Sequence, residues 1–379
     1  MQQFDYIVIG GGIFGCYAAL FLAEKGGKVA LIEKENHLFQ KASLVNQARL
    51  HSGYHYPRSV ATAAMSDEHK ERFTLEHKAF VHTSFEKFYA IDRFGSFTDP
   101  QQFERFCAYL NIPCKKLDEH PLFNFDRLEA LYQTVEHSFD PVLIGNYYRE
   151  KIEKERNIQL QLHTKIERAT TAANQWELEL IDVLDGALKS QISAPVVINA
   201  TYAATNSLNQ LFGLPSLALT HEISEIGFIT SKAFANKGLT VMDGPFGSIM
   251  PYGLSGILSL SSVAYTHHKI SYEALPHFDC QQISDPTCTP QAPGICTNCE
   301  RRPDSNAGKM LAQMRQYFSE KVEFDYLFSY FTIKSKLQSS HIDDGRPTEI
   351  SLLSTHPKYY CLFAGKINSI YEVEKILED

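Results

Sequence analysis

Hydrophobic and polar positions divide the first 35 residues into a strand, a helix and a second strand. Residues 6–9 form an apolar run of strand length, and residues 16–23 are mostly small and apolar, as in a buried helix. Gly26 and Gly27 follow this segment and can end the helix. The stretch KVALIEKE then predicts a second strand that ends in Glu33. The pattern therefore predicts a βαβ unit.

Three glycines join the first strand to the helix. Gly10, Gly12 and Gly15 have the spacing G-x-G-x-x-G. The first permits a tight turn, the second lets a pyrophosphate approach the backbone, and the third lets the helix lie close to the strand. The helix amino end favours anions, and Glu33 can accept hydrogen bonds from a ribose diol. The segment predicts a dinucleotide site, either FAD or NAD; the alternative is a tight βαβ turn without a ligand.

The later pattern differs from that of a simple nicotinamide dehydrogenase, in which further βα units follow at once. Residues 60–80 predict a helix, residues 84–92 a strand and residues 99–111 another helix. An alternating β pattern begins only at residues 163–182, and APVVINA then predicts a buried strand. The dinucleotide unit is therefore followed by inserted structure.

Composition and charge narrow the class of protein. A chain of 379 residues fits about two domains, and 44% hydrophobic with 21% charged residues is typical of an ordinary globular protein. A formal charge of −8 argues against a nucleic-acid partner. No apolar run is long enough for a transmembrane helix. Because a strand begins almost at the first residue, we expect no secretion signal, a cytoplasmic location and cysteines that are thiols.

Four segments, in order along nearly the whole chain, carry a family resemblance. They are the glycine motif with Glu33, NQARLHSGYHYP, VVINATYAATN, and DDGRPTEI followed by YYCLFAGKINSIYEVEKIL. Together they resemble the D-amino-acid oxidase (DAO) superfamily of FAD-dependent oxidoreductases. The early segment looks most like the L-2-hydroxyglutarate oxidase branch, through Asn46, His51, Gly53, Tyr56 and Pro57. The resemblance implies that the dinucleotide is FAD.

The fold that the resemblance implies is α/β, with an α+β substrate domain. A Rossmann-like FAD-binding domain would be assembled from residues 1–75, 136–210 and 338–379. Residues 76–135 and 211–337 would form a substrate domain on a mixed or antiparallel sheet.

The polar and aromatic stretch from Asn46 to Ser59 would run beside the flavin. Asn46, Arg49 and His51 are expected on the flavin side. Tyr54, His55, Tyr56 and Arg58 are expected to face the substrate or the domain interface, or simply to pack. The His51 region also resembles the site at which some relatives link a histidine covalently to flavin; a hydrogen-bonded histidine is the alternative. The full set implied to bind cofactor is Gly10, Gly12, Ile13, Phe14, Gly15, Glu33, Lys34, Asn46, Arg49, Leu50, His51, Ile166, Ala200, Arg346, Gly365, Lys366, Ile367 and Asn368.

The carboxyl-terminal part of the chain supplies candidates for the substrate side. In the related oxidases an arginine followed by proline binds the substrate carboxylate, and Arg346-Pro347 matches that pair; the alternative is an ion pair with Asp343, Asp344 or a flavin phosphate. Lys334 or Lys336 would lie near the flavin or be exposed. Tyr252, Tyr265, His267 and His268 are possible pocket residues, with at most one of the adjacent histidines facing the substrate. The catalytic candidates are Arg346, His51, Tyr252 and Lys334.

Two features do not fit the family pattern. Where relatives often carry glycine-histidine and a second glycine beside the flavin carbonyl, this chain has Gly365, Lys366 and later Ser369. Lys366 can still neutralise that region. A proline-rich stretch also holds four cysteines that suit a structural zinc, a disulfide or redox role, or no role beyond the loop: Cys280, Cys288, Cys296 and Cys299.

The implied reaction is oxidation of a C–N or C–O bond in a small amine, amino acid or 2-hydroxy acid, with hydride passing to flavin N5. Oxygen or another acceptor would then reoxidise the cofactor. The alternatives are a flavin monooxygenase, a non-catalytic flavin-binding partner protein and an NAD-dependent dehydrogenase.

Overall fold

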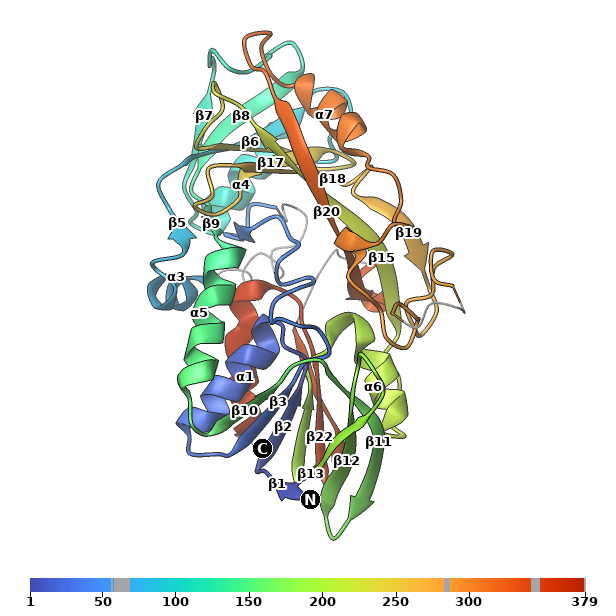
Figure 1. Cartoon of the computed structure of the whole chain (residues 1–379). Helices are drawn as coiled ribbons and strands as arrows, with labels where there is room; N and C mark the ends of the chain where they lie inside the picture. The colour runs from blue at the N-terminus through green and yellow to red at the C-terminus, as the bar shows by residue number, and fades with distance from the viewer. Residues whose placement is uncertain (56, 58–68, 283–286, 342–347, 378–379) are drawn as a thin grey trace.

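The computed structural model describes residues 1–379 except 56, 58–68, 283–286, 342–347 and 378–379. Strands dominate both halves of the molecule (Figure 1). The lower half in the figure holds a mostly parallel sheet flanked by helices, and the upper half holds a long mixed sheet. The chain begins in the lower half.

The lower sheet is built from parts of the chain that are far apart in sequence. Its order is β10 (Ile158–Gln161), β3 (Val29–Ile32), β2 (Tyr6–Ile9), β14 (Val196–Asn199), β22 (Lys358–Phe363) and β21 (Glu349–Thr355). All neighbours are parallel except β21 and β22. The central strands are almost entirely apolar because both faces of the sheet are covered.

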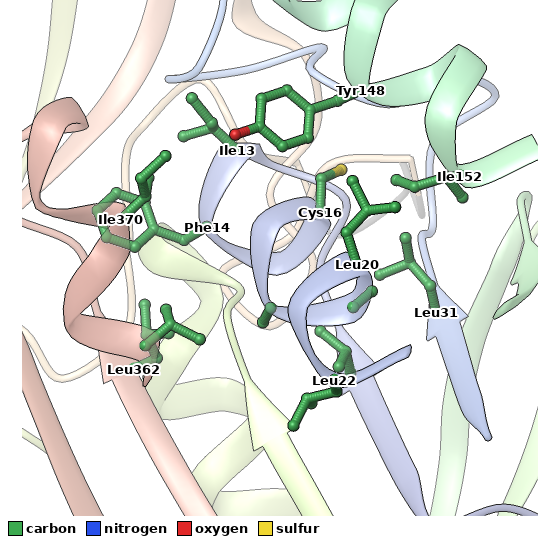
Figure 2. Packing of buried hydrophobic residues seen from close by; sticks show 14 of the residues in the cluster. Ile13, Phe14, Cys16, Leu20, Leu22, Leu31, Tyr148, Ile152, Leu362 and Ile370 are labelled. Atoms are coloured by element: carbon green, nitrogen blue, oxygen red, sulfur yellow. The ribbon is translucent and has the colours of Figure 1, made fainter. Parts of the chain in front are cut away.

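Alternate side chains of these strands belong to two different cores. Val8, Leu31 and Ile198 pack under α1 (Ile13–Glu24), α5 (Pro141–Lys154) and the 3-10 segment η4 (Ile367–Leu377). Figure 2 shows this core, in which Cys16, Leu20 and Leu22 of α1 lie among side chains from α5, η4 and the sheet. Ile7 and Val197 point to the opposite face, toward Trp176 and Leu178.

That opposite face is covered by a second, smaller sheet. Its order is β1 (Gln2–Gln3), β13 (Leu188–Ala194), β12 (Gln175–Asp182) and β11 (Thr164–Ala172). The short helices η1 (Tyr202–Ala204) and α6 (Thr205–Leu211) follow β14. The helix α6 contributes Leu208 to the same core as Trp176.

The upper sheet has nine strands. Its order is β19 (His267–Ser271), β15 (Leu219–Thr230), β18 (Leu258–Ser262), β17 (Gly247–Pro251), β16 (Lys237–Met242), β6 (Glu86–Asp92), β8 (Leu128–Thr134) and β7 (Cys114–Leu117), and β20 (Asp325–Leu337) pairs with β15. The helices α7 (Ala307–Arg315) and α4 (Pro100–Tyr109) bury Met310 and Phe103 against it.

Short elements connect the two halves. A three-stranded sheet has the order β4 (Arg49–Leu50), β9 (His137–Phe139) and β5 (Val81–His82). In the described ranges the helices not yet named are α3 (Lys70–Glu76), η2 (Cys296–Asn298) and η3 (Gln338–His341).

The α/β fold class with a nucleotide-type sheet assembled from separated segments is confirmed. The strand expected at 84–92 is β6, and the helix expected at 99–111 is α4, whose first turn is capped by the Asp99 carboxylate. All strands of the lower sheet fall in the ranges assigned to the first domain. The domain boundaries themselves stay a prediction. In the part of the chain that the structure describes, no helix is long and apolar enough to cross a membrane.

The close packing of α1 on the preceding turn generates a stability prediction. A Cβ on Gly15 would lie 1.9 Å from the Gly10 carbonyl oxygen, so Gly15→Ala forces backbone to move. We expect the free energy of unfolding to fall by about 2 kcal/mol or more. Gly308→Ala in α7 is the matched control, since nothing lies within 4 Å of its Cβ position. It should be neutral or slightly stabilising in the same thermal and urea denaturation. Equal stability of the two variants would contradict this packing.

Candidate functional site

A cavity of about 1400 Å³ lies between the lower and upper sheets. Its lower wall consists of the carboxyl ends of β2 and β3, the first residues of α1 and residues 200–204. Its upper wall includes parts of β16, β17, β18 and β20, and most of residues 39–51 together with residues 364–367 contribute further lining. The cavity is large enough for a dinucleotide together with a small molecule.

The glycine turn forms the floor of this cavity. Gly10 has φ of 109° and its Cβ position is only 2.6 Å from the Ala200 carbonyl oxygen, so a side chain is excluded there. Gly12 lines the cavity as the amino-terminal cap of α1 and contributes no capping side chain. The Ser43 hydroxyl instead accepts a hydrogen bond of 2.9 Å from the Ile13 backbone N–H. This positively polarised helix end, whose cap residue has no side chain, fits a pyrophosphate.

Glu33 lies beside the turn at the end of β3. Its carboxylate accepts hydrogen bonds from the Gly11 N–H at 2.5 Å and the Glu35 N–H at 2.8 Å. These bonds fix its orientation while the residue still lines the cavity, and each oxygen has a further lone pair for a ribose hydroxyl.

Lys34 and Lys41 bind the loop that carries the cysteines. Lys34 Nζ donates to the Pro293 carbonyl at 2.9 Å, and Lys41 Nζ donates to the same oxygen at 2.8 Å. Lys41 also forms a 2.8 Å ion pair with Glu35. Burial, followed by the charge of Lys41, lowers the pKa of Lys34 to about 8. Residues 291–294 thereby form one side of the cavity.

The segment expected beside the flavin divides between the cavity and the core. Asn46, Arg49, His51, His55 and Pro57 line the cavity, whereas Leu50 is completely buried in the helix-covered core. The Asn46 side chain holds its own loop, donating to the Ala42 and Ser43 carbonyls and accepting from the Ala48 N–H.

Tyr54 packs away from the cavity lining. Its hydroxyl donates to the Pro113 carbonyl at 2.6 Å, and its ring lies against Tyr89. Tyr56 and Arg58 lie outside the described residues.

The upper wall presents polar side chains to the cavity. Lys334, Lys336 and His267 line it, and the Glu222 carboxylate holds two of them, with Lys336 Nζ at 2.6 Å and His267 Nδ1 at 3.0 Å. The adjacent His268 does not line the cavity and pairs with Glu225 at 2.8 Å. The strand alternation therefore separates the two histidines.

Tyr252 does not line the cavity. Its hydroxyl donates to the Leu44 carbonyl at 2.6 Å, and its ring contacts Phe228 edge to face. This contact places Tyr252 in a small core between loop and sheet.

The remaining predicted cofactor residues are distributed as follows. Ile13, Phe14, Ile166, Ala200, Gly365, Lys366 and Ile367 line the cavity. Gly15 and Asn368 are buried behind it. Arg346, expected to bind a carboxylate, lies outside the described residues. At the carboxyl-terminal departure from the family pattern, the Ser369 hydroxyl donates to the Lys366 carbonyl at 2.7 Å and so closes the turn.

The four-cysteine stretch is not arranged as a metal centre. Cys280, Cys288, Cys296 and Cys299 are free and partly buried. Cys288 Sγ accepts a hydrogen bond from the Gly294 N–H at 3.2 Å. Among the residues that the structure describes, no group of three or more His, Cys, Asp or Glu side chains can hold a metal ion. The zinc expectation is therefore not supported.

Sequence reasoning missed several lining residues. Gly11 and Ser43 lie at the glycine turn, and Thr240, Ser248 and Ser261 lie on the upper wall. The signal for the last three was present as hydroxyl residues interrupting otherwise apolar strands, such as LSLSS. Their hydroxyls bond to partners distant in sequence, as when Gln47 donates to Ser261 at 2.8 Å.

Comparisons with known proteins agree with this geometry. The family model "FAD dependent oxidoreductase" (DAO) matches residues 5–252, and the chain belongs to this family. Among curated proteins it is similar to the FAD-dependent monooxygenase FPY4 of Fusarium mangiferae, with 26% identity over 262 residues. That match covers 68% of this chain and 64% of the relative, so the chain spans less than two thirds of that protein.

Solved structures show the same fold at low sequence identity. Glycine oxidase from Geobacillus kaustophilus superposes with a TM-score of 0.68 and 14% identity, covering 98% of this chain and 92% of the other. The L-alpha-glycerophosphate oxidase of Mycoplasma pneumoniae with FAD bound has a TM-score of 0.70 and 14% identity, covering 100% and 96%. The family binds FAD. The glycine turn and the amino end of α1 suit its pyrophosphate, and Glu33 suits a ribose. The likeness of the early segment to the L-2-hydroxyglutarate oxidase branch stays a prediction.

The lowered pKa of Lys34 generates a pH prediction. Between about pH 8 and 10.5 the unfolded chain holds a proton on Lys34 that the folded chain has lost, so the free energy of unfolding should rise with pH in this window. The cost of burying the charge is present below pH 8 and is relieved above 10.5. Lys34→Met should lack this rise, which amounts to about 1.4 kcal/mol per pKa unit. Denaturation across the window measures the difference, and the exposed Lys232→Met is the control. If the free energy of unfolding changed with pH in the same way for wild type and Lys34→Met, this prediction would be contradicted.

Proposed function

We propose that this chain is an FAD-dependent oxidoreductase that oxidises a C–N or C–O bond of a small amine, amino acid or 2-hydroxy acid. One observation carries the proposal: a single cavity joins the glycine turn to the charged and hydroxyl-bearing wall of the upper sheet. A nucleotide site that opens directly onto a second polar surface suits the delivery of a substrate to the reactive end of a cofactor.

The residues of the lower wall bind and orient the cofactor in this proposal. The α1 amino end with Gly10 and Gly12 binds the pyrophosphate, and Glu33 binds a ribose. Bound FAD supplies a two-electron acceptor for hydride. Lys34, Asn46, Ile166 and Ala200 shape the site, and Gly365, Lys366 and Ile367 close its far end.

The residues of the upper wall and the early segment position the substrate. His51 and Lys334 remain proposed catalytic residues because both line the cavity. Lys336 and His267 join them, since Glu222 holds both side chains at the wall. Tyr252 is not retained, because its hydroxyl already bonds to the loop. Arg346 stays a sequence-based proposal for a carboxylate contact.

A flavin monooxygenase is the second candidate, favoured by the similarity to FPY4. A monooxygenase would place an oxygen atom from O₂ in the product and would draw its electrons from a separate reductant. An oxidase would reduce its flavin with the substrate alone. Isotope-labelled oxygen in the product therefore distinguishes the two reactions.

A substrate screen tests the reaction class. The protein is loaded with FAD and mixed without oxygen with glycine, D- and L-amino acids, small amines and 2-hydroxy acids. We expect one class to remove the yellow colour of the flavin in a concentration-dependent manner. If dithionite bleaches the flavin but no member of these classes does, the proposed substrate class is wrong. If the protein retains no FAD, the assignment of the cavity fails as well.

Lys334→Met tests the upper wall. Removing a cation beside the reacting centre should slow anaerobic flavin reduction by about 100-fold, while FAD content stays the same. Lys321→Met is the matched control, because Lys321 is exposed on the surface. Its reduction rate should equal that of the wild type. A Lys334→Met rate within about twofold of wild type would remove this residue from the site.

A further inference from the structure

Arg49 crosses from the early segment to the upper sheet. It belongs to β4, yet its Nη2 donates to the Thr240 hydroxyl at 2.8 Å and also to the Ser248 hydroxyl. The residue is 4% exposed, and all three residues line the cavity. Thr240 and Ser248 also hydrogen-bond to each other at 2.9 Å. The guanidinium is therefore held rigidly against β16 and β17 at the cavity wall.

The charges around Arg49 do not balance. The Glu136 carboxylate lies 3.6 Å from Arg49 Nε and 3.8 Å from Lys87 Nζ. Both separations exceed hydrogen-bond length, and the Glu136 oxygens instead accept from the Tyr89 hydroxyl at 3.1 and 3.0 Å. Lys87 is also buried, and its Nζ donates to the Thr240 hydroxyl. One carboxylate thus faces two basic side chains.

The excess of positive charge in this cluster affects the pKa of the Lys87 amine. Burial and then the charge of Arg49 lower its pKa, while Glu136 acts in the opposite direction. An added anion would raise that pKa again and would neutralise the cluster.

Two guanidinium nitrogens have no hydrogen-bond partner in the described residues. These are Arg49 Nε and Nη1, both buried, although Nη2 is fully engaged. An unpaired buried donor is destabilising, more so when it is charged, and native proteins rarely leave one without a partner. A guanidinium with an unused N–H group can still donate to an oxygen of an anion.

We propose that Arg49 binds an anionic group of the substrate, either a carboxylate or a phosphate, through the N–H group of Nη1, with the guanidinium positioned by the Thr240 and Ser248 hydroxyls. Elements other than β4, β16 and β17 would bind the cofactor pyrophosphate, namely the glycine turn and α1. The inference rests on the proposed function and deepens it, because an arginine that binds an anionic group would favour acidic substrates over neutral amines. It also differs from the sequence expectation that Arg346 supplies the carboxylate contact.

Anion titration of the oxidised, FAD-loaded protein tests the inference without turnover. Acetate and inorganic phosphate are the two probes, and the readouts are the change in flavin absorbance and the rise in Tm that accompanies ligand binding. We expect saturable binding of one probe, which identifies the anion class. Arg49→Met should weaken that binding by about 10- to 100-fold. Arg49→Lys, which keeps the charge but loses the planar fork, should give an intermediate loss.

Two further variants complete the design. Arg93→Met is the matched control: this arginine is half exposed, donates to the Phe125 and Leu128 carbonyls and pairs with Glu129 away from the cavity. It should bind the probe as the wild type does. Arg346→Met separates the competing assignment, because a loss of binding in this variant alone would assign the anion to Arg346 and not to Arg49. If Arg49→Met does not fold, Arg49→Lys carries the test.

Three results would overturn the inference. They are unchanged affinity in the folded Arg49 variant, loss of affinity in Arg346→Met alone, and absence of saturable binding of both probes to the wild type. Failure of the proposed function looks different: the anion binds and depends on Arg49, yet no acid substrate reduces the flavin.

Discussion

The closeness of the Gly10–Gly15 turn to the backbone around Ala200 is the constraint on which the site depends. A Cβ at Gly10 would lie 2.6 Å from the Ala200 oxygen, and one at Gly15 would lie 1.9 Å from the Gly10 oxygen. Side chains are therefore excluded where β2, β14 and α1 meet. This leaves the amino end of α1 at the floor of the cavity without a side chain from the turn over it, and the positive end of the helix dipole favours a ligand that is rich in anionic oxygens.

The upper wall complements this floor. The floor offers backbone and a helix dipole, whereas the wall offers side-chain cations and hydroxyls on a stiff sheet. The early segment connects them, because β4 pairs with β9 while the Arg49 side chain reaches β16 and β17. In the proposed function a substrate would be held by elements that are rigid in themselves, and small changes in strand side chains would alter specificity without disturbing the nucleotide site.

Local sequence patterns predicted the floor better than the wall. Glycine spacing, the apolar strands and the terminal Glu33 are short-range features, so the nucleotide site could be predicted from some 30 residues. The separation of His267 from His268 followed from the strand period. The contacts of Arg49 with Thr240 and Ser248 join residues about 200 positions apart, and no local pattern encodes them. Tyr252 was expected in the pocket but does not line it, and the reason is the same: its hydroxyl bonds to Leu44, which is 208 positions away.

The loop bound by Lys34 and Lys41 sets the shape of one side of the cavity. Its backbone oxygens at Ala292 and Pro293 accept from these two ammonium groups, and residues 291–294 flank the cavity beside Glu33. Two charged side chains thus fix the position of a backbone segment that is distant in sequence. The width of the cavity beside Glu33 therefore depends on the charge of these lysines as well as on the packing of the sheet.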